Sequence, residues 1–489
     1  MAFGDTLLKA IQKSGLQIPF PCGGYGYCGK CIVLASGLLD EPSPRELMFL
    51  DGCPKGSRLA CFAAILGDCE VILSEKTKAV VETAYSAWDG SLDPIYSSGY
   101  GAAFDIGTTT VAGQLFHHCS KEPLTALGEM NAQQPYGADV ISRLVYCNEH
   151  SVSSLQDIIR NQLVSMLGQM CKTVGVEHSD INYLVVAGNS IMQCIFCGIE
   201  PGPLGAAPFT MPTHFDFEAD FTLEGFPNAF IYIPPASSAY IGGDITCSAL
   251  ASNMCHMPGN ILLIDAGTNG EIVLSSEGRL SCCSTAAGPA FEGANIECGS
   301  NASIGAVDSV QLVGGILRHT TVGNAPAAKI CGSGLIDAVA AMLDIGALDV
   351  KGKILKEYEG VFTIPDTQVY ITQKDIRQVQ LAKSAIRAGI DTLLHECGIS
   401  CDELDAIILC GGFGSYLRPE SAERIGLLPE SAALKTRAIG NAASNGAGQI
   451  LQSNARGQEA KNICRLMENI DLASNPFFID RFIKASFFP

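Results

Sequence analysis

Three cysteines and four glycines fall within residues 21–31, which read PCGGYGYCGKC. Cys22, Cys28 and Cys31 have the spacing C-x5-C-x2-C, and Cys61 follows 30 positions after Cys31. A 2Fe–2S cluster needs four thiolates that converge on two irons, and a tight loop can supply three of them. Glycines permit positive φ angles and bring backbone N–H groups close to the sulfur atoms. The spacing predicts an iron–sulfur cluster, because a disulfide would not require the glycines.

Two alternatives remain open for these cysteines. A structural zinc site usually pairs two C-x2-C hairpins, whereas this stretch contains one. Cys53 and Cys69 flank Cys61 in the sequence, and either could replace it as the fourth ligand.

The N-terminal region resembles plant- and adrenodoxin-type ferredoxins. Residues 5–33 read as a helix, the cysteine loop and a strand, and CEVILSE at 69–75 reads as a closing strand. The resemblance implies a β-grasp domain over residues 1–78, with Cys61 as the fourth ligand because ferredoxins present that cysteine in a similar RLAC context. The helix begins almost at Met1, so we expect either that the start codon is misassigned or that the β-grasp sheet lacks its first hairpin. Its loss would leave one sheet edge unpaired and part of the core uncovered.

A second chemical motif occurs twice. DIGTTT at 105–110 and DAGTNGE at 265–271 each place an acidic residue and a glycine in a turn between two strands, 160 positions apart. Such turns let backbone N–H groups approach phosphate oxygens. We expect Asp105 and Asp265, assisted by Glu271, to hold Mg²⁺ through water or to orient an attacking water. The expected phosphate contacts are Gly107, Thr108, Thr109, Thr110, Gly267, Thr268 and Asn269.

A third glycine-rich element, CGGFGS, follows a predicted strand at 410–415. Its small residues would let adenosine lie against the backbone. The expected adenosine contacts are Gly411, Gly412, Phe413, Gly414 and Ser415. Residues 440–451 then begin a helix of small residues, which suits close packing against another helix. The sequence has no G-x-x-x-x-G-K-[ST] motif, so a P-loop is excluded.

The three elements resemble those of the ASKHA superfamily, which includes actin, sugar kinases and a heat-shock chaperone. The resemblance implies a duplicated α/β fold of two ribonuclease-H-like halves, with ATP bound between them. We place the halves at 102–258 and 259–489, and a linker without periodicity at 79–101. The only tryptophan, Trp88, lies in the linker, and we expect it to dock on a neighbouring element.

The composition limits the classes of partner. The formal net charge is −19, which argues against nucleic acid and anionic membranes, because both need a basic face. No apolar run approaches the roughly 20 residues of a membrane helix. The N-terminus reads as an amphipathic helix rather than a signal peptide, so we expect a cytoplasmic protein. Its 21 cysteines fit a reducing compartment.

The whole chain resembles the reductive activators of corrinoid enzymes. The matching segments are PCGGYGYCGKC, NAQQPYGADVISRL (131–144), VVAGNSIMQ, YIGGDI, DAGTNGEI, STAAGPAFEGANI (284–296), ICGSGLIDAV (330–339), DIRQVQLAKSAIRAGI (375–390) and CGGFG. The resemblance implies ATP-dependent reduction of Co(II) to Co(I) in the corrinoid protein of a methyltransferase system. It also implies an external electron donor for the cluster, and it is compatible with a homodimer. Larger members carry a middle domain, which we expect this chain to lack.

Two further segments have a functional and a structural interpretation. STAAGPAFEGANI at 284–296 reads as a loop that contacts the corrinoid protein, with Ser284 or Thr285 closest to cobalt; the alternative is a packed loop that supports the second phosphate turn. Cys194 and Cys197 form a C-x2-C in an apolar stretch, which favours a core position over a second metal site.

Three other functions compete with corrinoid activation. Activators of 2-hydroxyacyl-CoA dehydratases resemble the ATPase half, but they lack an N-terminal ferredoxin and hold a 4Fe–4S cluster between subunits. A sugar or carboxylate kinase with a redox appendage would need a small-substrate pocket in the cleft. A scaffold ATPase would use the ferredoxin domain only structurally.

Overall fold

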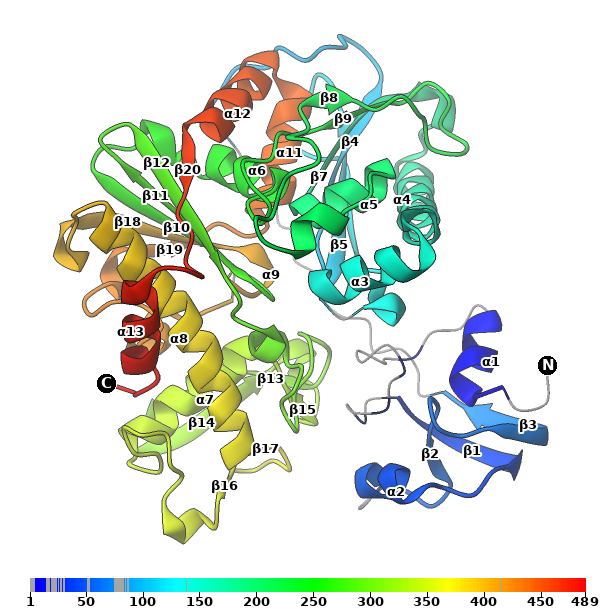
Figure 1. The fold of residues 1–489 in the computed structure, drawn as a ribbon, viewed down its shortest axis with the longest axis vertical. Coiled ribbons are helices and arrows are strands. Elements are labelled where there is room, and N and C mark those ends of the chain that lie inside the picture. The colour runs from blue at the N-terminus through cyan, green and yellow to red at the C-terminus, as the bar shows by residue number, and fades with distance from the viewer. Residues whose placement is uncertain are drawn as a thin grey trace.

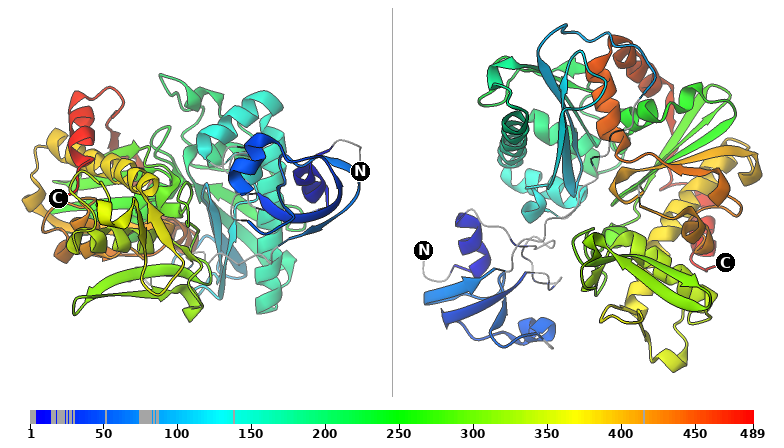
Figure 2. Two further views of the ribbon diagram at one scale, coloured as in Figure 1. Left: turned by 90° about the horizontal axis from the view of Figure 1, so that it is seen from below. Right: turned by 180° about the vertical axis from the view of Figure 1, so that it is seen from behind.

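The computed structural model of the chain describes residues 5–14, 18, 24, 26, 29, 31–50, 53–73, 83, 85, 88–137, 139–414 and 416–489, and for Gln12 and Phe413 only the backbone is described. A small N-terminal domain lies beside two larger α/β halves (Figure 1). The N-terminal domain and the C-terminal helix lie on opposite sides of the molecule (Figure 2). Within the described ranges, no helix combines the length and apolarity needed to cross a bilayer.

The N-terminal domain has a three-stranded sheet of order β2-β1-β3. Its elements are α1 (Leu7–Lys13), β1 (Ile32–Leu39), α2 (Pro44–Leu50), β2 (Ser57–Leu59) and β3 (Ile65–Ile72). Leu7 and Ile11 of α1 pack with Val33 on one face of the sheet. The opposite face exposes aliphatic side chains: Ile32, Leu34, Leu38, Leu66 and Ile72. Among the described residues, which begin at Asp5, β1 is the first strand, and the expectation about the first hairpin stays a prediction.

The first half is built on a six-stranded sheet of order β6-β5-β4-β7-β9-β8. The strands are β4 (Tyr100–Ile106), β5 (Thr110–His117), β6 (Thr125–Met130), β7 (Ile181–Gly188), β8 (Phe217–Glu218) and β9 (Phe230–Ile233). β4, β5 and β6 are antiparallel, and β4, β7 and β9 are parallel. One face packs against α3 (Val140–His150), α4 (Val152–Val174) and α5 (Ser190–Cys197).

The second half repeats this topology in the order β19-β18-β10-β11-β12-β20. The strands are β10 (Asn260–Ala266), β11 (Gly270–Ser276), β12 (Arg279–Thr285), β18 (Leu404–Cys410), β19 (Thr436–Ala438) and β20 (Met467–Asn469). β10, β11 and β12 are antiparallel, and β10, β18 and β19 are parallel. The same order of three antiparallel and two parallel strands in both halves confirms the predicted duplicated α/β fold.

Between β12 and β18 the second half carries further elements, drawn in green to yellow in Figure 1. They are β13 (Ala306–Val313), β14 (Ile316–Thr321), β15 (Lys329–Ile330), α7 (Gly332–Asp344), β16 (Val361–Thr363), β17 (Tyr370–Thr372) and α8 (Gln373–Glu396). The core of this half lies between its large sheet and helices α7 and α8. After β18 come α9 (Gly411–Gly414) and α10 (Pro419–Arg424), and α13 (Pro476–Ala485) packs on α8 near the C-terminus.

A separate core joins the two halves. It contains residues of β4 and β10 together with α6 (Gly243–Ser252), α11 (Ala442–Gln452) and α12 (Asn454–Leu466). Helices α6 and α11 lie between the two sheets (Figure 1). A Cβ atom built on Gly446 of α11 would lie 2.0 Å from the carbonyl oxygen of Cys247 on α6. The prediction that residues 440–451 form a closely packed helix is therefore confirmed.

Candidate functional site

The two phosphate turns occupy equivalent places in the two sheets. Asp105 lies near the end of β4 and pairs with Ala112 of β5, and Asp265 lies near the end of β10 and pairs with Glu271 of β11. In the second turn, the Gly267 N–H donates to the carbonyl oxygen of Asn269 at 3.0 Å. In the first, a Cβ atom on residue 107 would lie 2.8 Å from the carbonyl oxygen of Thr110, so only glycine fits. Both turns are tight hairpins, as the sequence predicts.

Four carboxylates lie close to one another beside the two turns. Asp244, in the first turn of α6, joins Asp105, Asp265 and Glu271. Desolvation raises the pKa of Asp105 to about 7; the Asn441 amide, which donates to it at 3.0 Å, lowers that pKa, and the charge of Asp265 raises it. Desolvation, followed by the charges of Asp105 and Asp265, holds the pKa of Asp244 well above its ordinary value. Desolvation, then Asp244 and Asp265, does the same to the pKa of Glu271. Burial, and secondarily the like-charge strain between the carboxylates, therefore disfavours ionisation of this cluster.

Asp265 has its own set of neighbours. The Ser248 hydroxyl of α6 and the Cys410 thiol of β18 donate to its Oδ2 at 3.4 and 3.6 Å. Desolvation raises the pKa of Asp265, and these two donors lower it. Among the described residues, no three His, Cys, Asp or Glu side chains converge closely enough to hold a metal ion by themselves. A cation here would keep several waters, as Mg²⁺ does when phosphate supplies further ligands.

Glu292 connects the two phosphate turns, and the sequence does not single it out. The Thr109 hydroxyl donates to its Oε2 at 2.5 Å, and the Thr268 hydroxyl donates to its Oε1 at 2.6 Å. Thr108 lies next to this bridge: its hydroxyl accepts from the Asn189 amide at 3.2 Å, and its carbonyl oxygen accepts from the buried Arg143. Thr110 and Asn269 belong to the same turns, Thr110 as the first residue of β5.

The third element meets the second phosphate turn. Gly411 begins α9 directly after β18, with φ +85°, and a Cβ atom there would lie 2.3 Å from Oδ1 of Asp265. Gly412 has open space around it, and Gly414 lies beside Leu409. The Phe413 side chain and Ser415 lie outside the described residues. The glycine element therefore lies beside the second phosphate turn, and its contact with adenosine stays a prediction.

Ser284 and Thr285 do not form part of a loop. They end β12, where they pair with Glu271 and Gly270 of β11. The Ser284 hydroxyl donates to Oε1 of Glu271 at 3.4 Å, and the Thr285 hydroxyl donates to the carbonyl oxygen of Gly270 at 3.2 Å. Thr285 is 3% exposed, so its side chain is not accessible to another protein in this conformation. We expected the segment 284–296 to be a loop. That prediction is wrong for its first two residues, because β12 stays paired with β11 through Thr285.

The cysteine loop is described in part. The sulfur atoms of Cys31 and Cys61 lie 3.3 Å apart, comparable to the roughly 3.8 Å between two thiolates bound at 2.3 Å to one tetrahedral metal. Gly24, Gly26 and Gly29 have positive φ angles, as the tight loop predicts. Cys22 and Cys28 lie outside the described residues. The sulfur–sulfur distance favours Cys61 as the fourth ligand.

The two other candidate cysteines face elsewhere. The Cys53 thiol lies 3.8 Å from the carbonyl oxygen of Phe49, and Cys69 lies within β3, paired with Gly37 of β1.

The linker tryptophan docks as expected. The Trp88 indole N–H donates to Oε1 of Gln452 at 2.9 Å, at the end of α11. The Lys121 ammonium and the Arg456 guanidinium each lie 5.6 Å from the centre of the Trp88 ring. Lys121 belongs to the turn between β5 and β6, and Arg456 belongs to α12, so the linker is fixed where the two halves meet.

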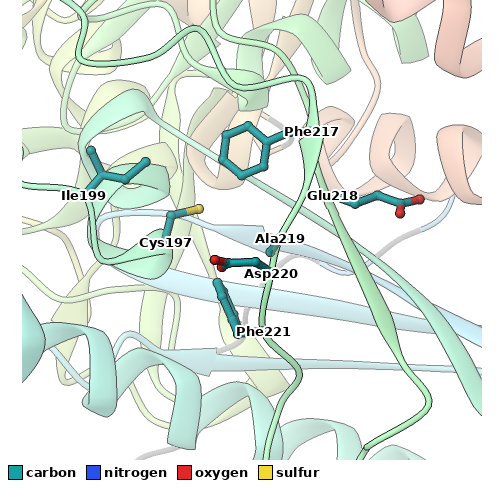
Figure 3. Close-up of a pocket in the computed structure, with 7 residues that line it drawn as sticks. All are labelled: Cys197, Ile199, Phe217, Glu218, Ala219, Asp220 and Phe221. Carbon is teal, nitrogen blue, oxygen red and sulfur yellow. The ribbon is translucent and has the colours of Figure 1, made fainter.

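The C-x2-C at Cys194 and Cys197 occupies the core side of α5. Burial raises the pKa of both thiols to about 12, which disfavours thiolate chemistry. Cys197 also lines a pocket at the outer edge of the first sheet, together with Phe217 and Phe221 (Figure 3). This pocket does not include the phosphate turns, and its aromatic lining is explained by packing.

The matching protein families cover nearly the whole chain. The family described as the C-terminal domain of RACo, the ASKHA domain, matches residues 259–489, and the RACo middle region matches residues 100–257. The 2Fe–2S iron–sulfur cluster binding domain matches residues 2–66. The expectation that the chain lacks the middle region is therefore wrong: the sheet that we assigned to the first ATPase half is that region.

Individual relatives agree with these families. The corrinoid activation enzyme RamQ of Eubacterium limosum is 32% identical over 423 residues, which cover 80% of this chain and 70% of RamQ. The [Co(II) methylated amine-specific corrinoid protein] reductase of Methanosarcina barkeri is 28% identical over 364 residues, which cover 68% of this chain and 66% of that protein.

A solved structure extends the match to the three-dimensional level. The structure of a reductive activator for corrinoid,iron-sulfur protein superposes with a TM-score of 0.76 at 28% identity, and covers 100% of this chain and 96% of the other. Sequence, domain order and fold agree, and the chain belongs to the family of reductive activators of corrinoid enzymes.

Proposed function

We propose that this protein uses ATP to drive one electron from an N-terminal 2Fe–2S cluster to the Co(II) centre of a corrinoid protein, which becomes Co(I). The observation that carries the proposal is the fusion of a ferredoxin-type cysteine loop to two opposed phosphate turns in one chain. Downhill electron transfer needs no ATP, so an ATPase fused to an electron carrier indicates an uphill reduction. The names of RamQ and of the Methanosarcina reductase support a corrinoid protein as the acceptor.

The chain offers residues for each part of an ATP complex. The hydroxyls and N–H groups of the two turns would bind the phosphates, and α9 would lie against adenosine. Asp105 and Asp265 would hold Mg²⁺ through its waters, with Asp244 and Glu271 completing a negative pocket for the cation. The like-charge strain in this cluster favours a bound divalent cation, because the cation neutralises it.

The N-terminal loop fits the cluster that its spacing implies. Cys31 and Cys61, whose sulfur atoms lie 3.3 Å apart, would hold one iron, and Cys22 and Cys28 would hold the other. When bound, a 2Fe–2S cluster supplies reversible one-electron transfer at low potential. An external reductant would reload it after each transfer.

ATP can act only through its different affinity for two conformations. A nucleotide shifts an equilibrium by the ratio of its affinities for the two states and by no more. The two phosphate turns lie in different halves, so a nucleotide between them favours their approach. We propose that this movement changes the docked corrinoid protein so that its cobalt accepts the electron; Ser284 remains a candidate for contact near cobalt.

The 2-hydroxyacyl-CoA dehydratase activators remain the second candidate class, because they too couple ATP to electron injection. The match of residues 2–66 to a 2Fe–2S domain favours the corrinoid activator.

An anaerobic assay tests the proposal. Reduced protein is mixed with a Co(II) corrinoid protein of a methyltransferase system, and the Co(I) absorbance is followed with and without MgATP. We expect Co(I) only with ATP, none with Asp265→Asn, and none with Cys61→Ser, which should also lose the 2Fe–2S spectrum. Cys53→Ser is the matched control and should keep both the spectrum and the activity. Co(I) formation without ATP, or with Cys61→Ser, would overturn the proposal.

A further inference from the structure

We infer that Glu292 is a positioning residue that clamps the two phosphate turns together and must release them when the phosphates of ATP bind. The inference rests on the proposed function, because it takes Thr109 and Thr268 as phosphate contacts. It adds a residue that links nucleotide binding to the segment 289–301 and to the helices that pack on it.

The geometry of the clamp is symmetrical. One carboxylate oxygen of Glu292 accepts from Thr109 at 2.5 Å, and the other accepts from Thr268 at 2.6 Å. Thr109 belongs to the turn after β4, and Thr268 belongs to the turn after β10, so a single side chain connects the two halves. Short hydrogen bonds to an ionised carboxylate are among the stronger ones in proteins.

Glu292 and the phosphates of ATP compete for the same two hydroxyl protons. A threonine hydroxyl has one proton to donate. While Thr109 and Thr268 donate to Glu292, neither hydroxyl can donate to a phosphate oxygen. A carboxylate and a phosphate that share the same donors also repel each other. Donation by these two hydroxyls to a phosphate therefore requires Glu292 to withdraw.

Arg143 supplies a positive charge that stays with the first turn. It is fully buried, and its guanidinium donates to the carbonyl oxygens of Thr108 and, at 3.1 Å, of Gly137. Desolvation raises the pKa of Glu292, while the two threonine hydroxyls and the Arg143 charge lower it. Because its hydrogen bonds, which also include Gln133 Oε1 and the Met192 sulfur, are all with uncharged groups of the first half, Arg143 can balance a phosphate after Glu292 has moved.

Release of Glu292 would be transmitted to neighbouring helices. Glu292 ends a short 3-10 turn, Pro289–Glu292, which packs against α7 and α8. Farther along the segment, the Glu297 N–H donates to Asp375 of α8 at 2.9 Å, and Asn301 contacts the Met130 sulfur of the first half at 3.4 Å. The segment thus touches both halves and the helices α7 and α8, and it is placed to report nucleotide binding to them.

Nucleotide affinity and kinetics test the clamp directly. We compare the wild type, Glu292→Gln and Glu297→Gln by calorimetry with a non-hydrolysable MgATP analogue and by steady-state ATP hydrolysis. Glu292→Gln removes the charged acceptor, so we expect the Kd of the analogue and the KM for ATP to fall at least about fivefold, while kcat does not rise in proportion. Glu292→Asp, one methylene shorter, should shift both constants in the same direction by a smaller factor. Glu297 is exposed in the same segment, and Glu297→Gln should match the wild type.

Hydrogen–deuterium exchange provides the second readout. We expect the analogue to increase exchange in residues 289–301 of the wild type, and to leave the already faster exchange of Glu292→Gln unchanged. Unchanged or weaker analogue binding by both Glu292 variants, or a wild-type segment whose exchange does not respond, would overturn the clamp while leaving ATP-dependent Co(I) formation intact. A wild type that binds no nucleotide would overturn the clamp and the proposed function together.

Discussion

Asp105 shows how a single side chain in the site opposes folding. Its pKa is raised from 3.8 to about 7, first by desolvation and also by the charge of Asp265. An acid with a raised pKa favours its neutral form in the folded state. As the pH rises from 3.8 to 7, the unfolded chain releases this proton and the folded chain retains it, so stability falls with pH in that window. Above pH 7 both states are ionised and the penalty no longer grows.

Replacing this carboxyl should therefore stabilise the fold at neutral pH. We expect Asp105→Asn to raise the free energy of unfolding by about 1–2 kcal/mol at pH 8, discounted because the carboxylate is partly exposed, and by much less near pH 4. The measurement is thermal unfolding at both pH values in EDTA without nucleotide. Asp157→Asn, at an exposed position on α4, is the control and should change little. A Tm of Asp105→Asn below that of the wild type at pH 8 would contradict the assignment.

Local patterns identify the residues of the turns but not every residue that contacts them. Asp105, Asp265 and Glu271 lie in repeated motifs, so the sequence predicts them. Asp244 and Glu292 lie in segments that resemble the family, yet neither has a motif of its own. They reach the site only because α6 and the 3-10 turn before Gly293 bring them there, and no spacing along the chain encodes that approach.

At the scale of helices and strands, the joint between the halves depends on close backbone contact. Gly446 of α11 faces the carbonyl oxygen of Cys247 on α6, and both helices belong to the core shared by the two sheets. α11 also carries Asn441 at its N-cap, which donates to Asp105 at 3.0 Å. The packing of α11 on α6 therefore positions a residue of the site.

A methyl group at this joint should separate the helices. We expect Gly446→Ala to lower the free energy of unfolding by about 1–3 kcal/mol, as overpacking does in other cores, and to reduce ATP hydrolysis because Asn441 moves with α11. The measurements are chemical denaturation and steady-state ATPase activity. Gly457→Ala in α12 is the matched control: its Cβ would meet only Ile450, at 3.8 Å, and it should be neutral or stabilising by up to about 1 kcal/mol. Equal stability of both variants would refute the close contact.

Periodicity predicts most of these elements because their buried faces are long. The apolar pattern over 375–398 predicts a helix, and α8 spans Gln373–Glu396. The apolar run NYLVVAG, which ends at Gly188, predicts a strand, and the structure has β7 there. The segment 284–296 is different, since its first two residues extend β12 and only the following ones turn. Two residues at the end of a strand, followed by alanines and a glycine, are too few to show the alternation of apolar and polar residues that distinguishes a strand from a loop.

For the whole molecule, the linker is anchored where the two halves meet. Lys121 of the first half and Arg456 of the second each lie 5.6 Å from the centre of the Trp88 ring, and the indole N–H donates to Gln452. The Gln452 amide in turn donates to the carbonyl oxygens of Ser120 and Lys121, at 2.7 and 2.8 Å. A rotation that moves α12 relative to the turn between β5 and β6 would change this environment.

The only tryptophan of the chain makes this movement measurable. We expect a saturating non-hydrolysable MgATP analogue to change the intensity or wavelength of tryptophan emission, because the distances from the ring to the two cations change. Trp88→Phe should remove the signal while retaining nucleotide binding, and Asp265→Asn should reduce the response. Identical emission with and without bound analogue would contradict a movement at this joint.

The domain organisation was predictable to the extent that sequence motifs mark it. The ferredoxin loop and the two phosphate turns lie in three successive regions of the chain. Each of these regions has a main sheet of its own. That the region of the first turn matches the middle region of the family was missed, because its D-x-G-T turn was interpreted only as the start of the first ATPase half. The sheet of order β6-β5-β4-β7-β9-β8 belongs both to the first α/β half and to the middle region of the family.

Nucleotide bound between the two turns should release an electron from the cluster to cobalt. Electron paramagnetic resonance of one anaerobic sample, containing the reduced protein and a Co(II) corrinoid protein, follows donor and acceptor together. We predict that both signals persist without nucleotide, and that the reduced-cluster and Co(II) signals decline in equal amounts after MgATP is added. Loss of the Co(II) signal without ATP, or its persistence while the cluster signal disappears, would contradict the account.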